Sequence, residues 1–272
     1  MVKVHAHRGA SAYAPENTLA SFQLAHDMHS DGIECDIHLT VDGVFVVCHD
    51  ETIDRTSTGS GRIAEMKYAD IISEDFGSKY SAAFRGQTAP TLEQMLDIVR
   101  DMDPINIEIK AFAGDEDAAL HQFYGILKRY DVIARVIVSS FNDRILKRLK
   151  ELHADIKTGY LYVISDDIPA PVQAKIDQMK ENGTANKLSP LYRDLLIAKK
   201  DVVNFALSLH CDAIHPCLTY LTQATVEEAH AKNMQVNCWT PNTREEVAHG
   251  LALGCDGIIT NHPDWALSLL GR

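Results

Sequence analysis

Short runs of β-branched and other apolar residues alternate with longer, more polar segments along the 272-residue chain. Nine of these runs predict strands: residues 2–7 (VKVHAH), 32–37 (GIECDI), 44–49 (VFVVCH), 105–110 (INIEIK), 136–141 (VIVSSF), 158–163 (TGYLYV), 213–218 (AIHPCL), 235–240 (QVNCWT) and 257–260 (GIIT). The segments between most of them predict helices, at residues 17–29, 92–102, 115–130, 143–152, 193–209, 225–232 and 243–253. Such alternation is typical of parallel strands joined by crossover helices. The pattern therefore predicts an α/β protein, a somewhat irregular (β/α)8 TIM barrel.

Two of the predicted helices carry capping signals at their first residues. Asn17 and Thr225 are residue types that often accept a hydrogen bond from the first helical turn. Thr225 is followed three residues later by Glu228, which is the spacing of a capping box. We therefore expect helices to begin at these two residues.

The opening of the chain departs from the regular alternation. Between Asp36 and Val44 there are too few residues for a helical crossover. Asp42-Gly43 is instead a signal for a hairpin-type turn. Nine predicted strands are also one more than an eight-stranded barrel needs. Two arrangements satisfy the pattern: one extended segment runs back along the barrel edge, or one candidate strand lies outside the barrel.

The segment at about 51–103 is long and rich in serine, glycine and charge, as in ETIDRTSTGSGRI and EDFGSKYSAAFRG. Connections of this length usually carry a function or a small structure of their own. We expect an insertion of turns and short helices here, after the third strand and over one end of the barrel. The chain shows no solenoid repeat and no obvious linker. Residues 1–272 are therefore predicted to form a single TIM-barrel catalytic domain with this insertion.

Composition and charge limit the classes of partner and compartment. The formal net charge of -12 leaves no broad basic surface for nucleic acid or anionic lipid. No apolar run is long enough to cross a bilayer, and MVKVHAHRGA is too polar for a signal peptide. The six cysteines form no C-x-x-C pair and lie mostly in apolar runs, which predicts buried free thiols. We expect a cytoplasmic protein without stable membrane anchoring; the sequence sets no oligomeric state.

Charged residues interrupt two of the predicted strands at a spacing of two. Residues two apart on a strand face the same side, so Glu34 points with Asp36, and Glu108 points with Lys110. If the intervening apolar residues pack outward, these charges face the barrel interior, where a charge is costly unless it is paired or binds a metal. One lysine cannot neutralise three carboxylates. This excess predicts one divalent cation, and oxygen-only ligation favours Mg²⁺ or Ca²⁺ over zinc, with Mn²⁺ a further candidate.

The candidate polar residues follow one another at the ends of the first four predicted strands. In barrels of this type, strand C-termini meet at the face that carries the chemistry. The residues concerned are His7 and Arg8 (first strand), Glu34 and Asp36 (second), His49 (third), and Glu108 and Lys110 (fourth).

Each of these residues has a structural alternative: an exposed charge at a strand end, a simple salt bridge, or a hydrogen-bonded packing histidine. His5 is assigned to the core, and His38 stays ambiguous. Asn17 is interpreted as a helix cap rather than a ligand. Asp50 either orients His49 or caps the insertion.

Several motifs resemble the glycerophosphodiester phosphodiesterase family, in the family's order, from Ala6 to Asp264. They are HRGASAYAPENTLASF, ECDIHLTVDGVFVVCHDETIDRTSTGSGRI, PTLEQML, INIEIK, CWTPNT and GCDGIITNHPD. The resemblance implies a TIM barrel with a small insertion after the HD motif. It also implies metal ligands at Glu34, Asp36 and Glu108, acid and base roles for His7 and His49, and phosphate contacts from Arg8 and Lys110.

Two positions depart from the family pattern: Asn261 stands where Asp is common, and Pro241 where Val is usual. Neither is expected to touch the metal or acid–base residues. The resemblance also puts Trp239 at a pocket wall against the glycerol carbons, with Phe141 as a candidate opposite wall; both have barrel-rim packing as the alternative.

The resemblance implies metal-dependent hydrolysis of small glycerophosphodiesters, such as glycerophosphocholine, to glycerol 3-phosphate and an alcohol. Which histidine is the base stays open, as does attack by water or by the glycerol 2-hydroxyl. A lysophospholipase D-type enzyme is an alternative, but it needs an apolar entrance, and the insertion offers only isolated apolar residues (Ile63, Met66, Phe76, Phe84). A non-catalytic glycerophosphate binder is a third possibility; its expected signature, loss of a histidine or metal ligand, is not seen.

Overall fold

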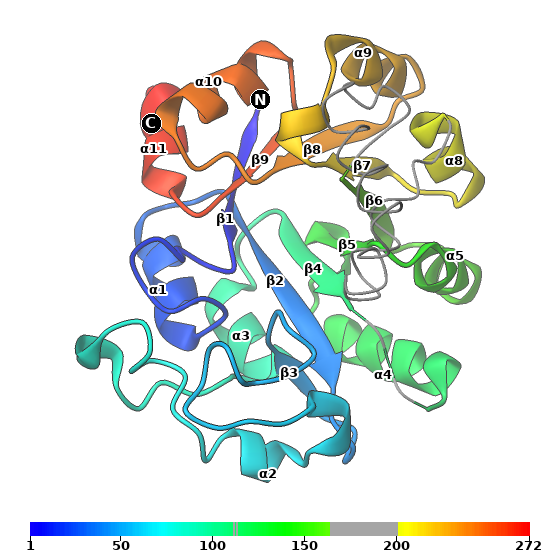
Figure 1. The fold of residues 1–272 in the computed structure, drawn as a ribbon. Coiled ribbons are helices and arrows are strands. Elements are labelled where there is room, and N and C mark those ends of the chain that lie inside the picture. The colour runs from blue at the N-terminus through cyan, green and yellow to red at the C-terminus, as the bar shows by residue number, and fades with distance from the viewer. Residues whose placement is uncertain (111, 113, 164–200) are drawn as a thin grey trace, which may run out of the picture.

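A closed barrel of parallel strands forms the centre of the protein (Figure 1). The computed structural model describes residues 1–110, 112, 114–163 and 201–272. Within these residues eight parallel strands follow the order β1-β9-β8-β7-β6-β5-β4-β2, and a β1–β2 pairing closes the ring. This confirms the predicted TIM barrel. The strands are β1 (Lys3–His7), β2 (Gly32–Leu39), β4 (Ile105–Ile109), β5 (Val136–Ser140), β6 (Lys157–Tyr162), β7 (Ala213–Pro216), β8 (Gln235–Trp239) and β9 (Gly257–Thr260).

Helices surround the barrel and cover its outer face (Figure 1). They are α1 (Leu19–Asp27), α3 (Leu92–Val99), α4 (Glu116–Arg129), α5 (Asp143–Leu152), α8 (Val202–Ser208), α9 (Gln223–Ala231), α10 (Arg244–Ala252) and α11 (Pro263–Leu269), with short 3₁₀ turns at η3 (Ile133–Arg135) and η5 (Leu218–Tyr220). The first part of the helix predicted at 193–209 lies outside the described residues. No helix in the described part of the chain has the length and apolar character needed to span a membrane.

The ninth strand, β3 (Phe45–Val47), runs antiparallel to β2, with Val47 opposite Ile37. A tight turn joins the two strands, and Gly43 occupies it with a φ of 79°. Of the two arrangements that the sequence allowed, the chain therefore adopts the one in which an extended segment runs back along the barrel edge.

Two predicted helix caps are wrong, one by a single residue and the other by three residues. Thr18, not Asn17, caps α1, because Asn17 has a φ of 57° whereas an N-cap needs extended backbone. Thr222, not Thr225, caps α9; its side chain accepts from the Thr225 amide, so the helix begins earlier than the Thr225 and Glu228 spacing suggested.

The segment between β3 and α3 contains the short helices η1 (Ile63–Glu65), α2 (Tyr68–Ile71) and η2 (Ala82–Phe84). Its apolar side chains form a small cluster of their own, which joins the base of the insertion to β3. The buried members are Val46, Cys48, Ile53, Ile63, Ile71, Phe76 and Ala89. In Figure 1 this segment forms the cyan region around α2.

Polar side chains occupy part of the barrel interior, while the apolar core lies between the strands and the helices. His5, Asn106, His215 and Asn237 are all buried, so His5 is a core residue as expected. Burial lowers the pKa of His5 to about 4 and that of His215 to about 3, which leaves both rings neutral at pH 7. The six cysteines are free thiols, and all but Cys217 are fully buried.

We expect Gly32→Ala to lower the free energy of unfolding by about 1–3 kcal/mol or more, because a strand that starts here has no room for a side chain. A Cβ on Gly32 would lie 2.0 Å from the Pro104 carbonyl oxygen. The matched control is Gly125→Ala in α4, where no described atom beyond the adjacent residues and the helix's own backbone lies within 4 Å of the added carbon; it should stabilise by up to about 1 kcal/mol through helix propensity. Urea denaturation measures both, and a Gly32→Ala protein as stable as the parent would contradict the close approach.

Candidate active site

Three carboxylates meet inside the barrel mouth because β2 and β4 are neighbours in register. Asp36 lies opposite Glu108, and Glu34 lies two residues earlier on the same face of β2. One oxygen from each of the three side chains lies within 4.8 Å of the others. All three residues are buried, with exposed fractions of 4%, 1% and 7% for Glu34, Asp36 and Glu108. The structure thus brings together the cluster that the spacing predicted.

Two cationic side chains lie against this cluster. Lys110 Nζ is 2.7 Å from Asp36 Oδ1 and 2.5 Å from Glu108 Oε1. Arg8 Nε is 3.5 Å from Asp36 Oδ2, and the Arg8 backbone amide donates to Glu34 Oε2 at 3.0 Å. Asp36 Oδ1 and Glu108 Oε1 are close enough to Lys110 for ion pairs, yet neither accepts a hydrogen bond of ordinary geometry from the residues that the structure describes. Two acceptor atoms in the cluster therefore keep free capacity.

The pKa values of the three carboxyl groups reflect this crowding. Burial raises the pKa of Glu34 well above its usual range, and the charges of Asp36 and Glu108 raise it further. Burial also raises the pKa of Glu108. For Asp36, burial opposes ionisation, but Lys110 and Arg8 outweigh it and hold its pKa well below the usual range. Buried oxygen ligands with this unsatisfied negative charge fit a hard divalent cation.

Asn17 belongs to this cluster, although the sequence suggested only a helix cap. Its side-chain amide donates to Asp36 Oδ2 at 2.8 Å, and the residue is 4% exposed. Its left-handed backbone, which Asn tolerates better than most residues, turns the side chain inward. A signal was present: Asn17 and Thr18 are adjacent capping residue types, and only one of them can cap α1.

His7 ends β1 beside the carboxylates. Its Nδ1 donates to Asn261 Oδ1 at 2.6 Å, because an amide oxygen only accepts, and its Nε2 lies 3.8 Å from Glu34 Oε2. Burial, followed by the charge of Arg8, lowers the pKa of His7 to about 3. The expectation that Asn261 stays away from the acid–base residues is wrong: β9 pairs with β1, so the residue after β9 lies next to His7.

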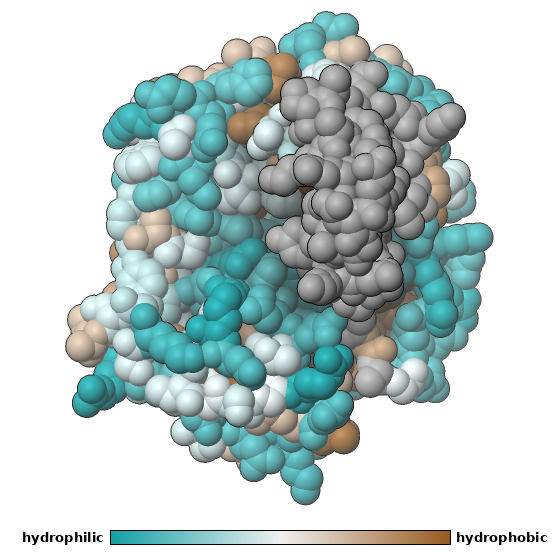
Figure 2. Space-filling view, viewed as in Figure 1, coloured by the Kyte–Doolittle hydropathy of each residue, from teal (hydrophilic) through white to brown (hydrophobic). Residues whose placement is uncertain are grey.

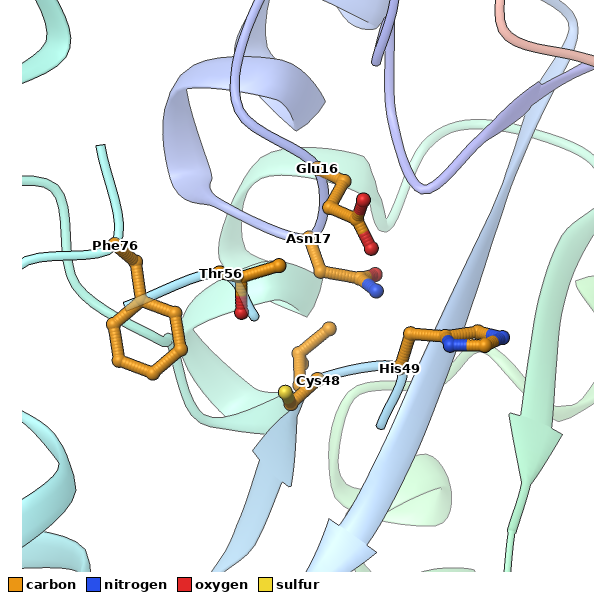
Figure 3. Close-up of a pocket in the computed structure, with 7 residues that line it drawn as sticks. Glu16, Asn17, Cys48, His49, Thr56 and Phe76 are labelled. Atoms are coloured by element: carbon orange, nitrogen blue, oxygen red, sulfur yellow. The ribbon is translucent and has the colours of Figure 1, made fainter. Parts of the chain in front are cut away.

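His49 reaches the same mouth from the return strand β3, and not from the end of a parallel barrel strand as the sequence suggested. Its Nδ1 lies 2.6 Å from Asp50 Oδ1, so Asp50 orients the ring. His38 Nε2 lies 3.2 Å from the His49 carbonyl oxygen, which ties β2 to this segment. Figure 3 shows the His49 ring extending toward β2, beside the side chains of Glu16 and Asn17.

The two aromatic residues predicted for a pocket wall contact each other. Phe141 follows β5 and Trp239 ends β8, and their rings meet edge to face with centroids 5.8 Å apart. The Trp239 indole donates to the His215 carbonyl oxygen at 2.8 Å, which fixes the ring plane. Both side chains therefore lie at C-terminal strand ends, the face of a TIM barrel that binds substrate.

A family model described as the glycerophosphoryl diester phosphodiesterase family matches residues 7–265. The chain belongs to this family. A glycerophosphodiester phosphodiesterase of Caldanaerobacter subterraneus subsp. tengcongensis is 31% identical to it over 274 residues, covering 99% of this chain and 98% of the relative. As a member of the glycerophosphoryl diester phosphodiesterase family, the chain is an enzyme that hydrolyses phosphoric diesters.

Solved structures agree on the fold of this family member. A phosphodiesterase from Oleispira antarctica, in complex with the product sn-glycerol-3-phosphate, has a TM-score of 0.78 at 25% identity and covers 99% of this chain and 97% of its own. A glycerophosphodiester phosphodiesterase from Agrobacterium tumefaciens has a TM-score of 0.74 at 22% identity, with coverage of 98% and 100%.

We expect Asn17→Asp to destabilise the protein by about 2 kcal/mol at pH 7, because a nearly isosteric carboxylate would then face Asp36 in a buried site. The neighbouring charge raises the pKa of the introduced carboxyl, so the folded state binds its proton more tightly than the unfolded state. The loss should therefore shrink as the pH falls toward 4. Asn233→Asp is the matched control, since Asn233 also has a φ of 57°, and it should change stability by less than about 0.5 kcal/mol. Equal losses at the two positions in chemical denaturation would contradict the placement of Asn17.

Proposed function

We propose that the chain hydrolyses glycerophosphodiesters to glycerol 3-phosphate and an alcohol, with one divalent cation and with His7 and His49 as the proton-transfer pair. The observation that carries the proposal is the meeting of two oriented histidines with a buried carboxylate cluster at one barrel mouth. The substrate class is supported by the Oleispira antarctica relative, whose structure holds sn-glycerol-3-phosphate. The partner of this site is thus a small molecule.

Glu34, Asp36 and Glu108 would hold the cation, Mg²⁺ or Ca²⁺ by their oxygen chemistry, with Mn²⁺ as the alternative. When bound, such an ion supplies Lewis-acid polarisation of the phosphate and a template for the reacting oxygens. The residues' own contribution is to present oxygens without full hydrogen bonding in a buried site. Lys110 keeps part of this negative charge compensated.

The hydrogen-bond partners of the two histidines support a division of roles between them. His7 donates from Nδ1 to a neutral amide, which leaves the Nε2 lone pair free to accept a proton from the attacking oxygen, whether water or the glycerol 2-hydroxyl. His49 donates from Nδ1 to the Asp50 carboxylate, which fixes the ring and leaves Nε2 as the atom that would give a proton to the leaving alcohol. His7 is therefore the proposed base and His49 the proposed acid.

Arg8 and Lys110 are proposed to bind the phosphate. The Arg8 guanidinium offers a planar fork, and Lys110 contributes a compact positive charge. Both are already held at the carboxylate cluster by ion pairs, which places positive charge beside the cation site without further ordering. Trp239 and Phe141 are proposed to pack against the glycerol carbons, because their edge-to-face contact gives an apolar surface at the same end of the barrel.

A lysophospholipase D-type activity finds less support. Of the apolar insertion residues, Ile63 and Phe76 are buried in the insertion's own cluster, and Met66 packs against it, so they form no apolar entrance. Figure 2 shows a hollow at the centre of this face, and the residues visible in it are hydrophilic. Both observations favour small, polar glycerophosphodiesters.

We expect Glu34→Gln to raise the cation concentration needed for half-maximal turnover by about tenfold or more, since one charged ligand is lost. The measurement is release of glycerol 3-phosphate from glycerophosphocholine, followed with a coupled dehydrogenase, during titration of Mg²⁺, Ca²⁺ or Mn²⁺ into chelator-treated protein. Glu65→Gln is the control, because Glu65 is an exposed partner of Arg62 in the insertion. A cation titration unchanged by Glu34→Gln would reject this ligand.

We expect His49→Ala to lower kcat/KM for glycerophosphocholine by about 10²–10⁴-fold, the usual contribution of a general acid, with folding near normal. Glycerophospho-p-nitrophenol should lose far less, because its leaving group departs without a proton. The control is His230→Ala, a histidine paired with Asp256 at 2.9 Å on α9. Equal losses on both substrates would remove the acid role, and activity within tenfold of the parent would remove the acid–base role altogether.

A further inference from the structure

One guanidinium from the insertion lies between two carboxylates of the active-site region. Arg55 donates from Nη1 to Glu16 Oε2 and from Nη2 to Glu16 Oε1, both at 2.8 Å. It also donates from Nε to Asp50 Oδ2 at 2.6 Å and from Nη2 to Asp50 Oδ1 at 3.3 Å. Four hydrogen bonds from one side chain to two carboxylates use most of its five N–H groups. Arg55 therefore has little capacity left to bind a substrate phosphate.

Each of these carboxylates also binds a proposed active-site residue. Glu16 Oε1 accepts from Arg8 Nη1 at 3.0 Å, and Asp50 Oδ1 accepts from His49 Nδ1 at 2.6 Å. The contacts form a continuous chain from Arg8 through Glu16, Arg55 and Asp50 to His49. Through Arg55 of the insertion, this chain joins the loop after β1, which carries the proposed phosphate-binding fork, to the end of β3, where the proposed acid lies.

The charges in this chain are strongly coupled. Burial opposes ionisation of Glu16, but hydrogen bonds from Arg55 and the charge of Arg8 outweigh it and lower its pKa to about 2. Hydrogen bonding from His49 lowers the pKa of Asp50, and the bonds from Arg55 add to this effect. Both carboxylates thus stay ionised across the working pH range, and the bridge persists.

Because Arg55 is partly exposed, a simpler interpretation is a surface ion pair, which usually contributes little to the stability of a protein. Its side chain is 48% exposed, whereas Glu16 and Asp50 are 22% and 32% exposed. Its geometry differs from that of an isolated pair, because the guanidinium is bidentate to two partners at once. A second contact, from the Tyr80 hydroxyl to the Ala12 carbonyl at 2.8 Å, also ties the insertion to the loop after β1, but it reaches no proposed active-site side chain.

We propose that Arg55 is a positioning residue that fixes His49 and Arg8 relative to each other through Asp50 and Glu16. The proposal rests on the proposed role of His49 as acid. Without the bridge, nothing in this chain of contacts would hold Asp50 to Glu16, so the carboxylate that orients His49 and the carboxylate that anchors Arg8 would move independently. Proton delivery and phosphate alignment would then depend on independent motions of two loops.

The first test compares Arg55→Met with Arg62→Met. Arg62 lies in the same insertion, is 56% exposed and pairs with Glu51 at 2.9 Å, but it contacts no proposed active-site residue. Arg55→Met should lower kcat by about 10–100-fold, the range typical of residues that orient a functional side chain, with a smaller change in KM. Arg62→Met should stay within about twofold of the parent, and thermal midpoints should match. Parent-like kcat in Arg55→Met would overturn the proposal.

A second test separates positioning from a general loss of structure. Arg55→Lys keeps the positive charge and should fold, yet it should remain impaired, because an ammonium lacks the planar fork that donates two hydrogen bonds to each carboxylate. Arg55→Ala should regain activity when guanidinium is added at a low, non-denaturing concentration, whereas His49→Ala should not. Parent-like kcat in Arg55→Lys, or no response of Arg55→Ala to guanidinium, would overturn the proposal.

Combining Arg55→Met with Asp50→Asn should lower kcat no further than Asp50→Asn alone, because both changes break the same chain of contacts. Fully additive losses would show that Arg55 does not act through Asp50. Failure of the proposed acid role of His49 can be told apart from failure of the Arg55 proposal, because it would appear in the same assay as normal turnover by His49→Ala.

Discussion

Three carboxylates buried at one end of a barrel impose the main electrostatic constraint on this protein. Their oxygens lie within 4.8 Å of one another, and two cationic side chains, Lys110 and Arg8, lie close enough to compensate them in part. Burial makes each negative charge costly, so the remaining excess requires either a proton, for which Glu34 is best suited, or an added cation. The barrel keeps this arrangement in place because the three carboxylates stand on paired strands, whose register leaves little freedom.

The proposed acid and base are held by different means around this constraint. His7 stands on a barrel strand and is oriented by Asn261 from the adjacent strand end. His49 stands on a return strand and is oriented by its neighbour Asp50, which depends in turn on the insertion. The position of His7 is therefore fixed by the barrel itself, whereas the position of His49 depends on the contacts between the insertion and the barrel.

Much of the fold and of the carboxylate cluster could be predicted from sequence, because both follow from local periodicity. Alternation along GIECDI and INIEIK placed Glu34, Asp36, Glu108 and Lys110 on one face, and parallel neighbouring strands brought them together. Three features could not be predicted this way. The inward turn of Asn17, the contact of Asn261 with His7 and the direction of β3 depend on which segments become neighbours in space. Residue type alone suggested a helix cap for Asn17 and a remote rim position for Asn261, and it left two arrangements open for the third extended segment.

The polar interior of the barrel has a consequence for acid tolerance. His5 and His215 are neutral when folded, with pKa values of about 4 and about 3, whereas in an unfolded chain each would titrate near the ordinary value of about 6.5. Below that ordinary pKa the unfolded chain binds protons that the folded barrel does not bind. Acidification therefore lowers the free energy of unfolding until the pH reaches the pKa values of the folded state. Because neutral imidazoles are packed inside the barrel, the folded state loses stability in acid, and this sets a lower limit to the pH at which the protein stays folded.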